Sequence, residues 1–280
     1  MTISTTTKTN ELLPKQNLTN LIIGLDIKNQ QDIEQNYVYI SPRGQVFSGI
    51  EGFWRWCEKQ NLDLNKTLEE YRNINKPYQK LRDNNFNNGL IDSANKVKSV
   101  FGEDLQMDEM YFCEFYKIPR FGKTRVGQLL LHSKQTQNAK YIQLICDEFA
   151  SKILDFAKDF DCICFAPPST PRAIQFMNVL DKTINSDKPR IKTWKEFGDI
   201  AIQQKTLKSR VDRVENARET IFLSSEQKFE SCLIIDDAIG SGSTLNEIAR
   251  KLKTQNIISG KIVGIGIVGN LDGYEVINEV

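Results

Sequence analysis

The sequence predicts an α/β fold: a doubly wound, mainly parallel sheet, preceded by a small N-terminal α+β region. Short and almost uninterrupted apolar runs lie within residues 161–170, 231–237 and 261–270, as is typical of strands covered on both faces. The segments between these runs carry apolar residues at helical spacing. Strands that alternate with helices in this way imply parallel pairing through right-handed crossovers. A chain of 280 residues, 40% of them hydrophobic, has room for one such domain and a smaller module.

The N-terminal part of the chain differs in character from the rest. Residues 1–17 are polar and lack an apolar core, which predicts a disordered start. Residues 18–105 predict a small module of unknown role, with strands in 21–27 and 36–49 and a helix over 49–60. That helix holds three neighbouring aromatic residues: Phe53, Trp54 and Trp56. We interpret them as the aromatic core of the module, and the alternative is a platform on which nucleic-acid bases stack.

Residues 106–280 are predicted to form the α/β domain. An alternating pattern over 111–134 predicts a hairpin at its start. A helix is expected over 141–160, and a strand stopped by prolines over 161–170. The buried stripe of that helix is Ile142, Ile145, Phe149, Ile153 and Phe156. A second helix follows over 171–184, with Pro171 suited to its first turn.

The second half of the domain carries the most informative segment. A polar stretch over 182–220 is predicted to contain one helix, 209–220. The apolar strand 231–237 then runs into a loop of small residues, 240–244, and a helix to about residue 253. The final apolar run completes the strand, helix and strand order.

Charge and cysteine usage exclude several classes of protein. The formal net charge is +1, so no global field attracts the chain to nucleic acid or membrane. The 6 cysteines are scattered and the only histidine is His132, which argues against a zinc site and leaves His132 a structural role. No apolar run is long enough to span a bilayer. We therefore expect a reduced, cytoplasmic protein without a membrane partner.

The strand 231–237 ends in two adjacent carboxylates, Asp236 and Asp237, followed by Gly240 to Thr244. In doubly wound sheets, ligands bind beyond the carboxyl ends of the strands. Small residues before a helix let backbone N–H groups converge on an anion, which favours a phosphate. Carboxylates suit a pair of sugar hydroxyls instead, so a ribose 5-phosphate group satisfies both halves. The alternative is a surface turn with a helix cap supplied by Thr244.

Other phosphate loops fit the sequence less well. A P-loop requires a lysine after its last glycine, and none stands at that spacing. The segment GIGIVG (264–269) matches the dinucleotide-binding pattern, but it lies inside the last predicted strand. We interpret its glycines as positions of close packing.

The segment LIIDDAIGSGST (233–244) resembles the signature of type I phosphoribosyltransferases: apolar residues, two acids, and a small-residue loop ending in Gly-x-Thr. Three further segments resemble, in this order, the body of the ComF-type, competence-associated members. They are LLLHSKQTQNAKYIQLICDEFA, CFAPPSTPRAIQFMNVL and QQKTLKSRVDRVENARETI. The likeness covers about residues 112–270 and implies the phosphoribosyltransferase type of doubly wound sheet.

The chain departs from the ComF pattern in three places. The usual N-terminal four-cysteine zinc module is absent, and an unrelated region stands in its place. The usual Arg-Gly-Phe-Asn segment is reduced to residues 175–178, and Gly240 replaces a common threonine.

The resemblance implies roles for individual residues. Asp236 and Asp237 would hold the ribose hydroxyls of phosphoribosyl pyrophosphate (PRPP) and would contact Mg²⁺ only indirectly. The 5-phosphate loop would be Ile239, Gly240, Ser241, Gly242, Ser243 and Thr244. The pyrophosphate loop would be Ser169, Thr170 and Arg172, although Arg172 also suits a helix surface. The mobile loop would include Lys205, Lys208 and Arg210, which also suit a solvated helix face.

The function that the resemblance implies is transfer of phosphoribose from PRPP to an acceptor, with release of pyrophosphate and Mg²⁺ as cofactor. The acceptor is expected to be a nitrogenous base. The alternative is a non-catalytic protein that senses PRPP or a nucleotide, or that binds single-stranded DNA. The densest basic cluster, on a predicted hairpin tip, could grip a nucleic-acid backbone or be a solvated turn. It consists of Lys117, Arg120, Lys123 and Arg125. A second copy of the chain, in a homodimer, is a further candidate partner.

Overall fold

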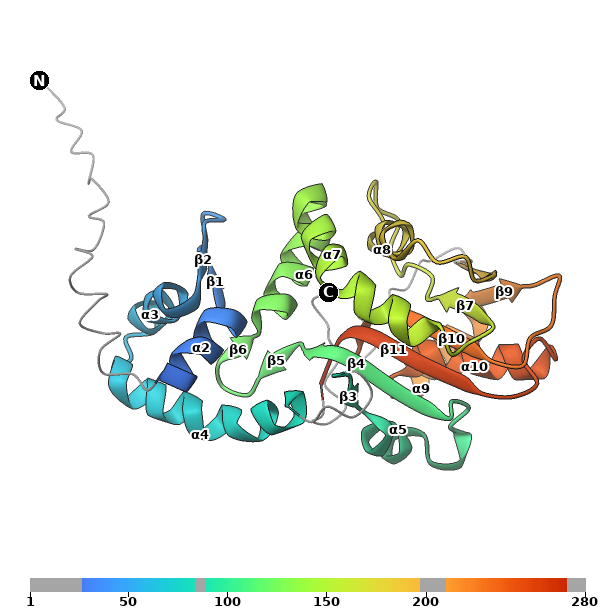
Figure 1. Ribbon diagram of the computed structural model, residues 1–280, viewed down its shortest axis with the longest axis horizontal. Helices are drawn as coiled ribbons and strands as arrows, with labels where there is room; N and C mark the ends of the chain where they lie inside the picture. Colours follow the sequence, from blue (N-terminus) through green and yellow to red (C-terminus); the bar gives the residue numbers. More distant parts are fainter. Residues whose placement is uncertain (1–26, 84–88, 197–209, 271–280) are drawn as a thin grey trace, which may run out of the picture. The chain divides into compact units, whose positions relative to one another are not determined.

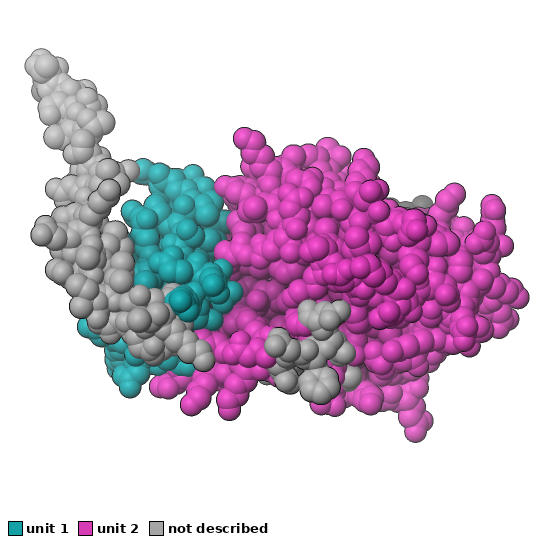
Figure 2. All heavy atoms as spheres, in the orientation of Figure 1, with its two compact units in different colours: residues 1–72 teal, residues 73–280 magenta. Residues whose placement is uncertain are grey.

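A computed structural model describes residues 27–83, 89–196 and 210–270 of the chain. The chain divides into two compact units, Met1–Arg72 and Asn73–Val280, which Figure 2 colours separately. The boundary predicted after residue 105 therefore lies later than the division observed. The reason is that residues 91–101 belong to the second unit: Ile91 pairs with Phe112, and Val97 packs in the same core. The predicted disordered start lies outside the described residues.

The first unit contains a small helical core beside a hairpin. Its elements are α2 (Ile27–Asn36), β1 (Val38–Ile40), β2 (Val46–Ser48), α3 (Gly49–Lys59) and the first part of α4 (Leu64–Arg82). The predicted strand segment 36–49 forms the antiparallel pair β1–β2, and the predicted helix at 49–60 is confirmed. Residues 21–26 of the first predicted strand lie outside the described residues, and Ile27 begins a helix. The rings of Tyr37, Phe53 and Tyr71 meet edge to face in the core, so the aromatic-core interpretation holds for Phe53.

The second unit is built on a seven-stranded sheet with the order β3-β4-β11-β10-β7-β8-β9 (Figure 1). The five central strands are parallel, and the two edge strands are antiparallel to their neighbours. The strands are β3 (Ile91–Asp92), β4 (Glu109–Phe115), β7 (Cys162–Phe165), β8 (Arg190–Lys195), β9 (Ile221–Ser224), β10 (Cys232–Ile239) and β11 (Ile262–Gly269). A separate pair is β5 (Lys117–Ile118) and β6 (Gly122–Lys123). The predicted α/β fold with a mainly parallel sheet is confirmed.

Helices cover both faces of this sheet (Figure 1). They are α5 (Ala94–Phe101), the short 3₁₀ helix η1 (Gly102–Asp104), α6 (Arg125–Thr136), α7 (Ala139–Ala157), α8 (Phe176–Ile184), α9 (Arg210–Thr220) and α10 (Ser243–Thr254). Successive side chains of β10 point to opposite faces. Leu233 and Ile235 pack with α6, α7 and α8, whereas Cys232 and Ile234 pack with α5, α9 and α10. The alternation holds as far as Ile235 and is broken beyond it, because Ala238 packs with the layer of Leu233 and Ile239 with the layer of Ile234.

The hairpin predicted over 111–134 is wrong except at its centre. Its first part is β4, which pairs in parallel with β11, and its last part is the helix α6. The side chain of Thr124 caps the start of α6, accepting a hydrogen bond from the Gly127 N–H at 3.1 Å. Only the short β5–β6 pair matches the predicted hairpin.

The predicted helix over 171–184 and the predicted polar stretch after it both need correction. Helix α8 begins at Phe176, so Pro171 lies in a loop before it. The side-chain amide of Gln175 stabilises that loop by donating to the carbonyl oxygens of Thr170 and Arg172. Strand β8, inside the polar stretch, and β9, directly after it, were not predicted; in β8 only Ile191 is buried, so it has no apolar run.

The glycines of the last strand are packing positions, as predicted. A Cβ atom added at Gly266 would lie 2.6 Å from Ile239 Cγ1, and one at Gly269 would lie 2.5 Å from Phe112 Cδ1. Within the described part of the chain, no helix combines the length and apolar character needed to cross a membrane.

Candidate functional site

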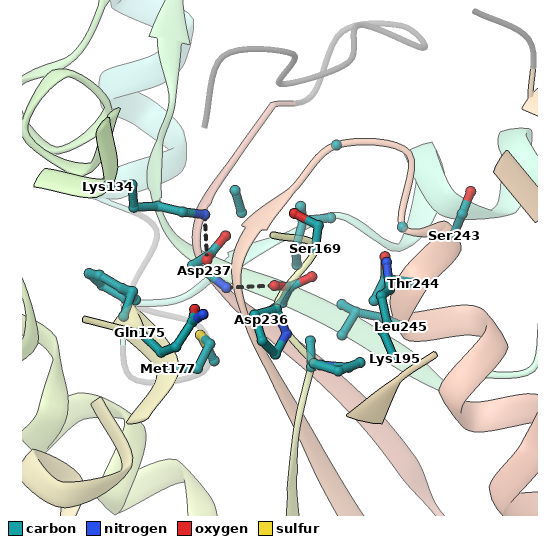
Figure 3. Close-up of a pocket in the computed structure, with 18 of the residues that line it drawn as sticks. Lys134, Ser169, Gln175, Met177, Lys195, Asp236, Asp237, Ser243, Thr244 and Leu245 are labelled. Carbon is teal, nitrogen blue, oxygen red and sulfur yellow. Dashed lines mark hydrogen bonds and ion pairs between the residues drawn. The ribbon is translucent and has the colours of Figure 1, made fainter. Parts of the chain in front are cut away.

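A pocket opens at the carboxyl ends of β10, β7 and β8 (Figure 3). It brings together Asp236, Asp237 and the loop 239–244, all of which were predicted to share one site. Parallel neighbours in a sheet end at the same edge, so the ends of β7, β8 and β10 converge although the sequence separates these strands.

Each of the two carboxylates is influenced by a lysine: Asp237 by contact with Lys134, and Asp236 by the charge of Lys195. Lys134 Nζ, from α6, donates to Asp237 Oδ2 at 2.6 Å. The side chains of Lys134 and Asp237 are 8% and 16% exposed, so this ion pair is largely removed from water. On the other side, Lys195 at the end of β8 lines the pocket, and its charge acts on Asp236.

The electrostatics of Asp236 differ from those of an ordinary surface acid. Burial and the neighbouring charge of Asp237 raise the pKa of Asp236 to about 7. The Asp237 N–H, which donates to Asp236 Oδ1 at 2.8 Å, opposes this rise, as do the charges of Lys134 and Lys195. Burial lowers the pKa of Lys195, and the charge of Asp236 opposes that shift.

The loop after β10 has the features of an anion-binding site. The hydroxyls of Ser241 and Ser243 lie 2.8 Å apart, and the Ser243 N–H donates to Ser241 Oγ at 3.3 Å. The loop leads directly into α10, whose first turn directs N–H groups toward the pocket edge. The residue before the helix is Gly242, and Thr244 lies inside the helix, so the alternative in which Thr244 caps α10 is wrong.

Gly242 is required by the backbone of this loop. Its φ is +79°, and a Cβ atom there would lie 3.1 Å from Met110 Cε. We expect Gly242→Ala to destabilise the protein by about 1–3 kcal/mol, from left-handed strain plus crowding. Gly122→Ala is the matched control, since Gly122 has a φ of +78° and no atom within 4 Å of the added Cβ. Chemical denaturation should show the larger loss for Gly242→Ala, and equal losses would contradict the crowding.

The predicted pyrophosphate loop is only partly in the pocket. Ser169 and Arg172 line it, and Ser169 lies beside the acid pair in Figure 3. Thr170 is not among the lining residues, and its Oγ1 is buried without a hydrogen-bond partner in the described structure. Of the predicted mobile loop, Lys205 and Lys208 lie outside the described residues. Arg210 begins α9, and its side chain is also outside them.

The predicted basic cluster lies away from this pocket. Lys117 and Lys123 pair across the β5–β6 hairpin, and Arg120 occupies its turn with a φ of 69°. Arg125 begins α6 and forms an ion pair with Glu148. His132 packs its ring against Tyr141, with centroids 5.6 Å apart, and does not line the pocket.

Sequence reasoning missed Lys134 and Lys195. A signal for Lys134 was present: it follows Val126 and Leu130 at intervals of four, so it continues the buried face of α6. A lysine at such a position requires a partner, because burying an unpaired charge is costly. Lys195 offered no comparable signal, since its strand was not predicted.

The pocket offers a metal ion few protein ligands. Among the described residues, no group of three or more His, Cys, Asp or Glu side chains is placed to bind one. One of the two carboxylates is already paired with Lys134. This donor set fits Mg²⁺ only if the ion keeps its waters or is carried by a ligand.

No protein-family model matches the chain, and no curated protein matches it. Among solved structures, hypoxanthine phosphoribosyltransferase from Staphylococcus aureus in an orthorhombic crystal form has 20% identity and a TM-score of 0.30, covering 44% of this chain and 60% of that one. The tetragonal form has 20% identity and a TM-score of 0.29, covering 48% and 80%. The first match thus spans less than two thirds of its neighbour. The α/β fold rests on the sheet described above and not on these neighbours.

Proposed function

We propose that the pocket binds PRPP and that the protein is a phosphoribosyltransferase. The observation that carries this proposal is the meeting, in one pocket at the carboxyl edge of the sheet, of an acid pair with a small-residue loop at a helix N-terminus. Backbone N–H groups and the hydroxyls of Ser241, Ser243 and Thr244 would bind the 5-phosphate. Asp236 and Asp237 would accept hydrogen bonds from the ribose hydroxyls.

In the proposed reaction, a nitrogen of the acceptor forms a bond to C1 of the ribose. The C1–O bond breaks, and the diphosphate leaves with the bonding electron pair. The acceptor nitrogen then loses its proton to solvent. Negative charge grows on the leaving diphosphate, so a cation in the pocket, Arg172 or Lys195, would stabilise the transition state. The chain's other contribution is positioning. Mg²⁺ would neutralise part of the diphosphate charge, and Asp236 and Asp237 would reach it only indirectly, through the ribose hydroxyls or water.

A non-catalytic sensor of PRPP or a nucleotide is the second candidate. It is favoured by one observation: Thr170, predicted for the pyrophosphate loop, does not line the pocket. Binding of single-stranded DNA by the basic hairpin stays a prediction. Its test is whether salt-dependent DNA binding disappears when Lys117, Arg120, Lys123 and Arg125 are neutralised together.

The first test is calorimetric titration of PRPP, with and without Mg²⁺. We expect micromolar, magnesium-dependent binding that an Asp236→Asn, Asp237→Asn double variant loses, because neutral amides are poorer acceptors for the ribose hydroxyls. Pyrophosphate release would then be measured with PRPP and a mixture of candidate bases. Release would indicate the enzyme, and PRPP binding without release would indicate the sensor. Absence of PRPP binding by the wild-type protein would refute the enzyme and the PRPP sensor, and titration of a nucleoside 5′-monophosphate would then test the nucleotide sensor.

A further inference from the structure

Lys134 lies where the mechanism above gives it no role. It comes from α6, a helix that contributes neither the acid pair nor the phosphate loop. It is largely buried, it lines the pocket, and its contact is with Asp237 on the layer opposite to α10. A buried ion pair is weak evidence for added stability, because desolvation of both charges offsets their attraction. This pair therefore calls for another explanation.

The pocket has two chemically different ends, on either side of the acid pair (Figure 3). Ser243 and Thr244 lie at one end, and Lys134, Gln175 and Met177 lie at the other. A ribose 5-phosphate with its phosphate in the loop and its hydroxyls on the acids would direct C1 away from the loop. The substituent on C1 would then lie at the end that holds Lys134.

We propose that Lys134 exchanges partners when PRPP binds, donating to Asp237 in the free protein and to the diphosphate on C1 in the complex. This inference rests on the proposed function. The exchange leaves neither group without a hydrogen-bond partner, since Asp237 gains a ribose hydroxyl as it releases the lysine. A lysine suits the task because its ammonium group is a compact charge on a flexible stem that binds phosphate well. Gln175, at the same end, adds a neutral donor.

The test compares three ligands at fixed Mg²⁺. Ribose 5-phosphate lacks the diphosphate, inorganic pyrophosphate lacks the sugar phosphate, and PRPP carries both. Calorimetry would be run on the wild-type protein, Lys134→Met and Lys134→Gln. The Gln variant keeps a donor for Asp237 without the charge. Lys158→Met is the matched control, because Lys158 is exposed and pairs with Asp155 on the surface. Thermal unfolding of each variant would be measured alongside.

Both Lys134 variants should bind PRPP and pyrophosphate roughly 10- to 100-fold more weakly, the loss expected for one charge-assisted hydrogen bond. Their affinity for ribose 5-phosphate should stay within about twofold of wild type, because that ligand lacks the diphosphate. An equal loss for ribose 5-phosphate and PRPP would make Lys134 a structural residue, and unchanged PRPP affinity would also overturn the exchange. If the wild-type protein binds neither sugar phosphate, the proposed function itself fails.

Discussion

Replacing Asp236 with Asn should stabilise the ligand-free protein above pH 7, whereas the same change at Asp237 should destabilise it. The two residues are adjacent, and both substitutions remove one carboxylate with little change in shape. Their effects differ because their surroundings differ. Asp236 carries a net electrostatic penalty from burial and from the charge of Asp237, whereas Asp237 holds a close ion pair with Lys134.

The pH dependence for Asp236 follows from its raised pKa. An acid whose pKa is higher in the folded state keeps its proton there after the unfolded chain has lost it. Stability therefore falls as the pH rises from the unfolded value of about 4 to the folded value of about 7, and the penalty is complete above that. Asn cannot ionise, so the variant escapes this loss. We expect a gain on the order of 2–4 kcal/mol at pH 8 and almost none at pH 4.

Asp237→Asn should lower the free energy of unfolding at neutral pH by about 3 kcal/mol, because it leaves the Lys134 ammonium without its counter-charge. Urea denaturation at a series of pH values would measure both variants against the wild type. Parallel curves for the wild type and Asp236→Asn across pH 4–8 would show that burial does not perturb Asp236. A stabilising Asp237→Asn would show that the ion pair is a net cost.

A stabilising substitution at Asp236 would also bear on function. Removal of a group that costs stability commonly costs activity, since active sites hold charges in places that folding alone would not favour. The side-chain amide that Asp236→Asn introduces is a poorer acceptor for a ribose hydroxyl than the carboxylate, so the variant should be more stable and bind PRPP less tightly.

The centre of the sheet and the phosphate loop could be predicted because their signals are local. The apolar run and the two acids of β10 and the small residues after it are contiguous in the sequence. This segment can therefore be recognised without knowledge of the strands beside it. Strand β8 could not be predicted in the same way. Of its six residues only Ile191 is fully buried, and Trp194 stacks on Phe222 of β9, a partner that the pattern of β8 does not reveal.

The lysines of the site illustrate a second limit. The ion pair between Lys134 and Asp237 joins residues 103 positions apart. Helical spacing places Lys134 on the buried face of α6, but it cannot say which acid lies opposite. That choice depends on the crossover that brings α6 to the Asp237 side of β10, which is a property of the topology.

Gly127→Ala should be the most damaging conservative substitution in α6. An added Cβ atom would overlap the Tyr116 carbonyl oxygen and lie 2.9 Å from the carbonyl carbon. Tyr116 cannot withdraw easily, because its N–H donates to the Gly269 carbonyl at 2.8 Å and its own carbonyl accepts from the Thr124 N–H at 3.0 Å. Helix α6 must therefore shift as a body. Overpacking against a fixed backbone costs about 3 kcal/mol.

A shift of α6 would also move Lys134. That residue lies roughly 10 Å further along the same helix, at a rise of about 1.5 Å per residue, and lines the pocket. Lys134 would move with α6 and lose its alignment with Asp237, so PRPP affinity should fall together with stability. Gln135→Ala is the matched control on the exposed face, expected to change stability by less than about 0.5 kcal/mol. Urea denaturation and PRPP titration of both variants would decide. A loss below about 1 kcal/mol for Gly127→Ala would mean that α6 yields without strain, and an ion pair on so compliant a helix could not position a ligand.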